Sequence, residues 1–164
     1  MREYQFFASE PRDEMLMGIC FPAALMLPTS ILGAVMWYFI PDYLPLSKSL
    51  TGFGWVGILG VIIGFSIMGL VKRYCIRKYT IQVSEKTILI DAVGGRKYQG
   101  EVHSVTLNQN KMKTVLEINL DHHKLIFIAR VKKNVFESSI FAGSTQEDIQ
   151  AMTTLYQALQ EVLY

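Results

Sequence analysis

The chain has 164 residues, of which 51% are hydrophobic and only 18% are charged, with a formal net charge of +2. The charged fraction is below the roughly 25% typical of soluble globular domains, and the deficit is confined to residues 15–71, which hold only Asp42 and Lys48. This composition argues against a wholly soluble protein, and the two separate cysteines, Cys20 and Cys75, argue against a disulfide framework.

Residues 1–14 are predicted to be a cytoplasmic N-terminal segment, and they hold four acidic and two basic residues. The apolar run that follows, residues 15–40, is 26 residues long, whereas about 20 residues are enough to cross a bilayer as a helix. It is too long for the apolar core of a signal peptide, and it lacks the basic flank and the small-residue cleavage site. The run therefore predicts a retained transmembrane helix.

Residues 41–51 are predicted to be a short external loop, and residues 52–71 a second transmembrane helix. The second run holds no charged residue and six glycines, including a Gly60–Gly64 pair at the spacing that lets two helix backbones approach closely. Gly57, Gly60 and Gly64 are therefore candidate helix-packing residues. Their partner is the first apolar helix of the same chain, a second copy of the chain or another membrane protein.

Basic residues cluster directly after the second apolar run. Lys72, Arg73, Arg77 and Lys78 lie there, against a single Lys48 in the loop. Because Lys and Arg are retained on the cytoplasmic side, this asymmetry predicts that both termini are cytoplasmic and the loop is external. The expected location is a bacterial inner membrane, in a multi-pass arrangement in which the four clustered residues contact lipid headgroups at the membrane surface.

Residues 72–164 are predicted to form a cytoplasmic domain. Apolar and polar residues alternate there, and turn-forming clusters separate the short segments, as is typical of antiparallel strands. A C-terminal helix is expected at about 145–163, behind a capping box of Ser144 and Glu147. Six or seven strands are expected, with apolar positions in 79–83, 88–90, 102–107, 115–120, 125–131 and 135–141.

A two-span hairpin followed by short antiparallel strands and one amphipathic helix is similar to the architecture of bacterial PH-domain membrane proteins. The resemblance covers residues 15–164 in the order of the elements. It implies a PH-like antiparallel β-barrel or sandwich closed by the C-terminal helix. The chloroplast and cyanobacterial photosystem I assembly factors share this architecture, so the resemblance also implies a role in assembling a membrane complex. It implies no ligand residues here, because the turn Ser84–Thr87 lacks the spaced Lys and Arg of phosphoinositide-binding PH domains.

No group of residues predicts catalysis, a cofactor or a metal ion. The chain has no G-x-S-x-G motif, and Gly94–Lys97 lacks the ending of a phosphate-binding loop. Asp121, His122 and His123 point in different directions from one tight turn and have no matching cluster elsewhere. The sequence therefore predicts a protein that is not an enzyme.

A second basic group is expected in turns of the cytoplasmic domain and is a possible partner-binding surface: Lys111, Lys113, Arg130, Lys132 and Lys133. This group would face the membrane, bind an acidic protein surface or keep the domain soluble. Nucleic acid is not an expected partner, because basic and aromatic residues are not interleaved on any one strand. The expected function is that of a membrane-anchored adaptor or scaffold that binds membrane lipids and another membrane protein or a second copy of itself. The alternative is an immunity protein that neutralises a membrane-acting bacterial toxin.

Overall fold

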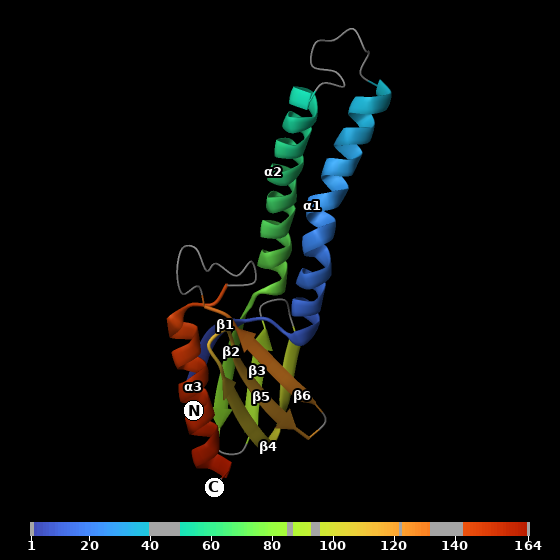
Figure 1. The fold of residues 1–164 in the computed structure, drawn as a ribbon. Coiled ribbons are helices and arrows are strands. Elements are labelled where there is room, and N and C mark those ends of the chain that lie inside the picture. The colour runs from blue at the N-terminus through green and yellow to red at the C-terminus, as the bar shows by residue number, and fades with distance from the viewer. Residues whose placement is uncertain are drawn as a thin grey trace. The chain divides into compact units, whose positions relative to one another are not determined.

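The computed structural model describes residues 2–39, 50–84, 87–92, 96–121, 123–131 and 143–163. The chain divides into a helical hairpin of residues 15–73 and a sheet unit that is built from the residues before and after the hairpin (Figure 1). The predicted domain at 72–164 is therefore incomplete without the N-terminal segment, which supplies part of the sheet.

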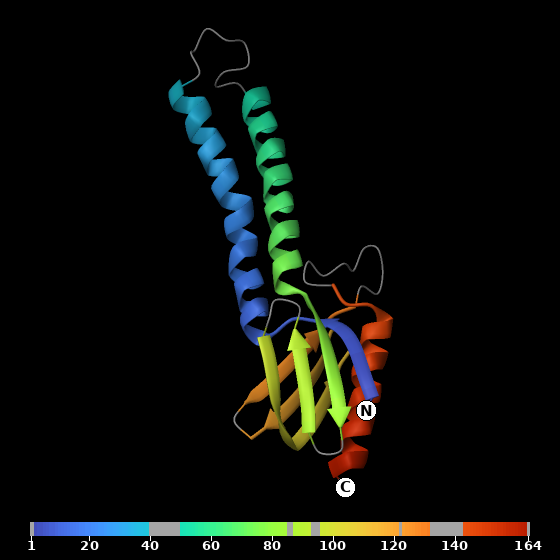
Figure 2. The same ribbon diagram turned by 180° about the vertical axis from the view of Figure 1, so that it is seen from behind.

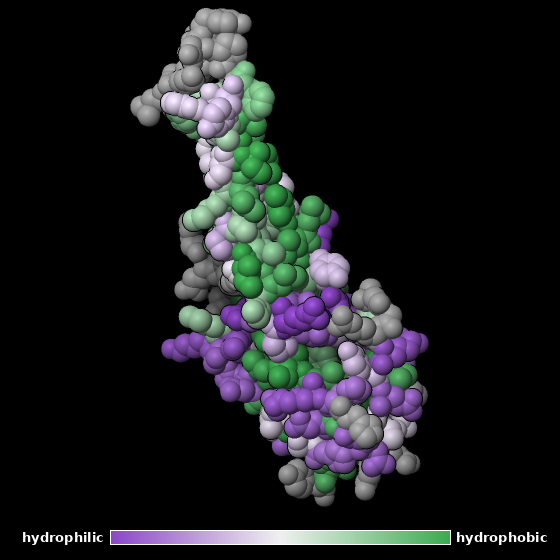
Figure 3. All heavy atoms as spheres, turned by 90° about the vertical axis from the view of Figure 1, so that its right-hand side faces the viewer, coloured by the Kyte–Doolittle hydropathy of each residue, from purple (hydrophilic) through white to green (hydrophobic). Residues whose placement is uncertain are grey.

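Two helices form the hairpin, α1 (Pro11–Phe39) and α2 (Leu50–Cys75). Both are predicted from the sequence, at 15–40 and 52–71, and both are confirmed as helices. Each is long and apolar enough to cross a membrane. Large apolar side chains are exposed along both helices, and the face of the hairpin in Figure 3 is mostly hydrophobic.

The helices extend beyond the predicted apolar runs because charged residues stabilise their ends. Pro11 fits the first helical position, and Asp13 and Glu14 stabilise the positive end of the α1 dipole. Lys72 and Arg73 lie in the last turn of α2 and stabilise its negative end. The charged flanks of the apolar runs are thus parts of the helices themselves.

Within the described residues, six antiparallel strands form the sheet, and they are ordered in space as they are along the chain. The strands are β1 (Arg2–Ala8), β2 (Arg77–Ser84), β3 (Thr87–Ala92), β4 (Arg96–Gln109), β5 (Thr114–Leu120) and β6 (Lys124–Ala129). β4 is long because its first half pairs with β3 and its second half with β5, with a register shift between Val102 and Ser104. Such an irregularity bends a strand, so the two halves of β4 belong to two layers of the sheet, one with β3 and one with β5. β2 to β6 confirm five of the predicted strands, whereas the strand predicted at 135–141 lies outside the described residues.

The N-terminal strand β1 was not predicted. Residues 1–14 were predicted to be a separate segment, but β1 pairs with β2 along its full length, from Arg2 opposite Val83 to Ala8 opposite Arg77. Its sequence, REYQFFA, has no clean alternation of apolar and polar residues. The strand is therefore specified by the free edge of β2 rather than by its own pattern.

At one end, the first and last strands are joined. Ser9 and Ile128 exchange two backbone hydrogen bonds of 2.9 and 2.8 Å. Below this bridge the rings of Phe6, Tyr79 and Phe127 pack together, with centroids 4.8 Å apart for Tyr79–Phe127 and 5.6 Å apart for Phe6–Phe127. β1 therefore shares one apolar core with the strands that follow the hairpin.

The C-terminal helix α3 (Gln146–Leu163) is confirmed close to its predicted bounds of 145–163. It contacts β1, β4 and β5, and it lies along the sheet in both ribbon views (Figure 2). Met152, Leu155 and Leu159 are fully buried in the core of the sheet unit. The helical spacing of apolar residues thus predicts the buried face correctly.

The capping box of α3 lies one residue later than predicted. Thr145 Oγ1 accepts the amide of Asp148 at 3.2 Å, and the Asp148 carboxylate accepts the amide of Thr145 at 2.5 Å. The predicted pair was Ser144 and Glu147. Ser144 instead donates its hydroxyl to the carbonyl of Phe7 at 2.8 Å, while Asp148 also accepts the Phe7 amide at 2.8 Å. The pairing with β1 therefore shifts the cap.

Candidate functional site at one end of the sheet

The chain leaves the sheet unit toward α1 and returns to it from α2 at the same end of the sheet. The register at this end is Ala8 opposite Arg77, Ser9 opposite Ile128, and Ala129 opposite Thr114. We call this the junction end; it also holds the β4–β5 turn, which directly precedes Thr114. Most of the charged residues singled out in the sequence lie here.

An ion pair between Glu14 and Arg130 is the best-formed interaction at the junction end. Nε and Nη2 of Arg130 donate to the two carboxylate oxygens of Glu14, each at 2.7 Å. The Arg130 side chain is 21% exposed and the Glu14 side chain 16%. This two-point geometry is the strong form of an arginine–carboxylate pair, and the hydrogen bond to Glu14 raises the pKa of Arg130. The pair fastens the first turn of α1 to the sheet.

Two more acidic residues near the start of α1 have partners in β2. Arg77 Nη2 lies 3.7 Å from Asp13 Oδ1, and both side chains are largely buried. The Tyr79 hydroxyl donates to Glu10 at 3.0 Å. Burial raises the pKa of the Tyr79 hydroxyl well above its usual value, and the neighbouring Glu10 carboxylate raises it further. This cluster was not predicted, although Pro11 with Asp13 and Glu14 in the following turn is a recognisable helix-start signal.

The two predicted basic groups each contain one arginine that pairs with an acidic residue of the same chain. Arg77 and Arg130 were predicted to contact lipid and a partner, respectively, but both turn toward acidic residues of the same chain. The physical reason is that Asp13 and Glu14, which are distant in the sequence, are brought beside them by β1. Lys72 and Arg73 remain in the last turn of α2, and Lys78 is half-buried on β2. Lys132 and Lys133 lie outside the described residues.

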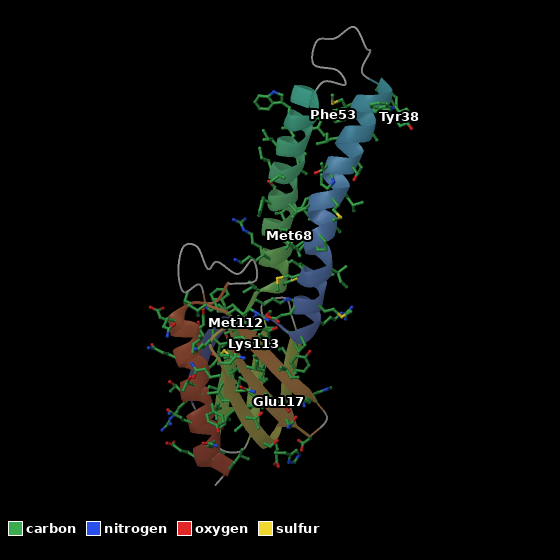
Figure 4. The ribbon with its side chains drawn as sticks, in the orientation of Figure 1. Tyr38, Phe53, Met68, Met112, Lys113 and Glu117 are labelled. Atoms are coloured by element: carbon green, nitrogen blue, oxygen red, sulfur yellow. The ribbon has the colours of Figure 1, made fainter. Side chains whose placement is uncertain are left out.

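The β4–β5 turn carries Lys111 and Lys113 on either side of Met112. Met112 and Lys113 are labelled in Figure 4. Asn110 Oδ1 accepts the amides of Met112 and Lys113 at 3.0 and 2.8 Å, and the Asn110 amide donates to the Lys113 carbonyl at 3.0 Å. The Met112 side chain is 80% exposed. These hydrogen bonds therefore fix the backbone of the turn, which carries one exposed apolar side chain between two lysines.

A pocket of about 250 Å³ lies between the start of α1 and the edge of β6. It is lined by Glu10, Pro11, Arg12, Tyr79, Tyr98 and residues 124–127. Glu10 is bound to Tyr79, and Lys124 Nζ lies 2.6 Å from Glu117, so two of its charged side chains are already paired. The pocket lining includes no Ser, Cys or His side chain that could act as a nucleophile with a base.

The sequence predicts no metal site at the Asp121–His123 turn. Asp121 pairs with Nε2 of His103 at 2.5 Å and accepts the amide of Glu101 at 3.0 Å, while the ring of His123 packs edge-on against Tyr98. In the part of the chain that the structure describes, no group of three His, Cys, Asp or Glu residues is placed to hold a metal ion. His122 lies outside that part.

In the hairpin, Gly60 and Gly64 lie where α2 meets α1. A Cβ atom on Gly60 would come within 2.9 Å of the Thr29 Cα, and one on Gly64 within 2.6 Å of the Ala24 carbonyl oxygen. A Cβ atom on Gly57 would have no described atom of another residue within 4 Å beyond its own helix turn and neighbours. Gly60 and Gly64 thus pack against the chain's own first helix, and Gly57 takes no part in that contact.

An apolar hollow of about 480 Å³ also lies within the hairpin. It is lined by Cys20, Ala23, Ala24, Leu27, Pro28, Ile31 and Leu32 of α1 and by Ile63, Ile67 and Val71 of α2. These side chains offer dispersion contacts and no charge, which suits an acyl chain or an apolar helix.

Comparison of the chain with models of protein families, with characterised proteins and with solved structures gives no match. The resemblance to PH-domain membrane proteins therefore stays a prediction.

Proposed function

We propose that the chain is an adaptor anchored in a bacterial inner membrane, without enzymatic activity, whose sheet unit binds a protein or the membrane surface during assembly of a membrane complex. The observation that carries this proposal is the pairing of β1 with β2, because these strands flank the hairpin in the sequence. If α1 and α2 cross a bilayer, the start of α1 and the end of α2 must then lie on the same side of it, because they lead from β1 and into β2. Two spans satisfy this requirement, and one or three would not.

The basic residues support a cytoplasmic position for the sheet unit. Lys72 and Arg73 lie in the last turn of α2, and Lys78 follows near the start of β2. The predicted loop between the helices holds one lysine. Lys and Arg next to a span favour the cytoplasmic side. Both termini of the chain are therefore proposed to be cytoplasmic.

A PH-like fold for the sheet unit is supported by two features. β4 bends and serves two layers of antiparallel strands, and α3 packs its apolar face against the core. The sheet unit differs from the expected layout in taking its first strand from the N-terminal side of the hairpin. In this proposal the hairpin is an insertion between the first and second strands of the domain.

The paired state of the acidic cluster supports an adaptor rather than an enzyme. Glu10, Asp13 and Glu14 are the acidic side chains nearest the predicted inner membrane interface, where a lipid-acting enzyme would need its acid or base. Each has a partner in the sheet unit, at Tyr79, Arg77 and Arg130. These pairings support a structural role for the cluster in preference to proton transfer to a substrate.

The orientation can be tested on the full chain with single cysteines introduced after Cys20 and Cys75 are replaced by alanine. Ser47→Cys, in the predicted external loop, should react with a membrane-impermeant maleimide in intact cells. Gln150→Cys, on the exposed face of α3, should react only after the cells are opened. The reverse pattern would contradict the proposed orientation.

The adaptor role requires a partner. Purification of the full chain in mild detergent after photo-crosslinking in cells should recover one membrane protein in stoichiometric amount. Repeated recovery of the chain alone would refute the adaptor proposal and leave only an anchored domain.

The second candidate, an immunity protein against a membrane-acting toxin, is favoured by the apolar hollow between α1 and α2, which could receive an intruding helix. Expression of the chain beside toxin genes from its own genomic neighbourhood should then rescue growth. Full toxicity of every neighbouring toxin in the presence of the chain would eliminate this candidate.

A further inference from the structure

We propose that the β4–β5 turn is a membrane-docking tip, in which Met112 enters the interface of an anionic bilayer while Lys111 and Lys113 bind the phosphate groups of its lipids. The proposal rests on the membrane anchor described above and names the surface that the sheet unit contacts. The described turn consists of Asn110, Lys111, Met112 and Lys113.

The exposure of Met112 is the first argument for docking. Large apolar side chains of the sheet unit are mostly buried in its core, yet Met112 is 80% exposed. The turn cannot easily fold the Met112 side chain inward, because the Asn110 side-chain oxygen accepts the backbone amides of Met112 and Lys113. The backbone amide of Asn110 also donates to the Lys113 carbonyl. The side chain is thus displayed outward by a rigid turn, which reduces the entropy lost when it inserts.

The flanking lysines are the second argument. Lys111 is exposed and Lys113 is half-buried, and both lie next to the apolar tip. Long basic side chains can place their aliphatic stems along an apolar surface while their ammonium groups reach the headgroup layer. An apolar residue between two lysines therefore matches the order of layers at an anionic membrane surface.

The position of the turn is the third argument. Thr114, which follows the turn, lies opposite Ala129, and the neighbouring Ile128 is bridged to Ser9. The turn is therefore at the junction end of the sheet, where the chain leaves for α1 after Glu14. If α1 begins its crossing at about Met15, this end of the sheet is the one that is tethered next to the headgroups.

The small size of the tip favours a lipid surface over a protein partner. A specific protein interface usually buries about 800 Å² on each side, with shape complementarity across a patch. One methionine and two lysines on a convex turn cannot supply such a patch. A bilayer interface needs no complementary shape, and it accepts an isolated apolar side chain together with neighbouring cations.

The test uses the purified full chain, with Cys20 and Cys75 replaced by alanine, reconstituted in vesicles of phosphatidylcholine with or without phosphatidylglycerol. A nitroxide is attached after Met112→Cys, and its access to a water-soluble paramagnetic reagent and to oxygen is compared. Glu101→Cys, exposed and opposite Thr87 at the other end of the sheet, gives the aqueous reference. Ile63→Cys, in the middle of α2, reports insertion of the hairpin separately.

We expect the label at position 112 to be shielded from the aqueous reagent only in the anionic vesicles, and the label at position 101 to stay accessible in both. Lys111→Glu with Lys113→Glu should reduce the shielded population at least roughly tenfold, since each base near an anionic surface contributes to binding. Arg2→Glu with Ser84→Glu and Thr87→Glu, three exposed positions, changes the net charge equally at the other end of the sheet and should leave the shielded population unchanged.

If the aqueous reagent reaches the label at position 112 while the label at position 63 is shielded, the docking tip is overturned and the anchor stays intact. If the aqueous reagent also reaches the label at position 63, the anchor is overturned as well. Shielding that is equal in neutral vesicles, or that rises with the ratio of protein to lipid, would also overturn the proposal, because it would indicate a contact that does not depend on anionic lipid or a contact with a second copy.

Discussion

Removal of Arg130 tests whether the acidic first turn of α1 holds the junction end together. Arg130→Met keeps much of the apolar stem but leaves the Glu14 carboxylate with the Ser9 hydroxyl, 3.4 Å away, as its nearest remaining donor. Loss of one partner from a fully buried ion pair costs about 3–5 kcal/mol. Because the two side chains are 16% and 21% exposed, water solvates part of the remaining charge. We therefore expect the free energy of unfolding to fall by about 2–3 kcal/mol.

Native-state hydrogen exchange of the full chain in detergent measures this loss in the sheet unit. The readout is the protection of the β5 amides, Thr114–Leu120, which lie beside β6. Lys97→Met is the matched control, because the pair of Lys97 with Asp91 is largely exposed, at 3.6 Å. An exposed pair contributes only about 0–1 kcal/mol, so the control should change protection little.

A double variant, Glu14→Gln with Arg130→Met, separates the lost attraction from the stranded charge. With no carboxylate left to desolvate, the double variant should be more stable than Arg130→Met alone. If Arg130→Met costs no more than Lys97→Met, the two-point geometry does not stabilise the sheet and the reasoning fails.

Three further predictions concern separate parts of the chain. Burial raises the pKa of Tyr79, so above pH about 10 its hydroxyl stays neutral in the folded chain while it ionises in the unfolded chain. The free energy of unfolding should therefore fall as the pH rises above about 10, and it should fall less steeply with pH in Tyr79→Phe. Thr145→Ala should cost about 1 kcal/mol in urea unfolding, whereas Glu147→Ala should cost much less, and equal losses would restore the predicted cap. Gly60→Leu should lower the thermal stability of the hairpin by roughly 1–3 kcal/mol, as judged by helical circular dichroism, and Gly57→Leu should not.

The parts of the fold with a strong local signal could be predicted from the sequence. The two long helices follow from the length of their uncharged apolar runs, the strands from β2 to β6 from short apolar segments between turn-forming clusters, and the buried face of α3 from its helical repeat. β1 could not be predicted in this way. Its residues Arg2, Glu3 and Gln5 interrupt any alternation, and its stability comes from pairing with β2 and from the contacts of Phe6 in a core assembled from distant segments.

The missing strand also explains why the partners of Arg77 and Arg130 could not be predicted. Without β1 at the edge of β2, nothing places Asp13 near Arg77 or Glu14 near Arg130, and both arginines look free to meet a lipid or a partner. The tip residues Lys111 and Lys113 could be identified as candidates because a local turn displays them. A side chain that is displayed by a local turn can be predicted from the sequence, whereas one that is paired through long-range sheet register cannot.

The order of the elements gives the hairpin a role in forming the sheet. Ala8 and Arg77 are separated by 68 residues, and closing so long a loop costs conformational entropy that grows with loop length. When α1 and α2 pack at Gly60, most of those residues are already ordered and only short connections remain to be closed. Loosening the hairpin should therefore weaken the pairing of β1 more than the pairing of strands that follow it.

Gly60→Leu tests this coupling if hydrogen exchange is followed strand by strand. Exchange in β1 should accelerate by roughly tenfold or more, which corresponds to about 1.4 kcal/mol, while β5 keeps its protection. Gly57→Leu should change neither strand, because its Cβ meets nothing in the described hairpin. Equal protection of β1 in both variants would mean that the sheet closes without help from the hairpin, and that β1 is held by its own contacts with Asp148 and Ser144.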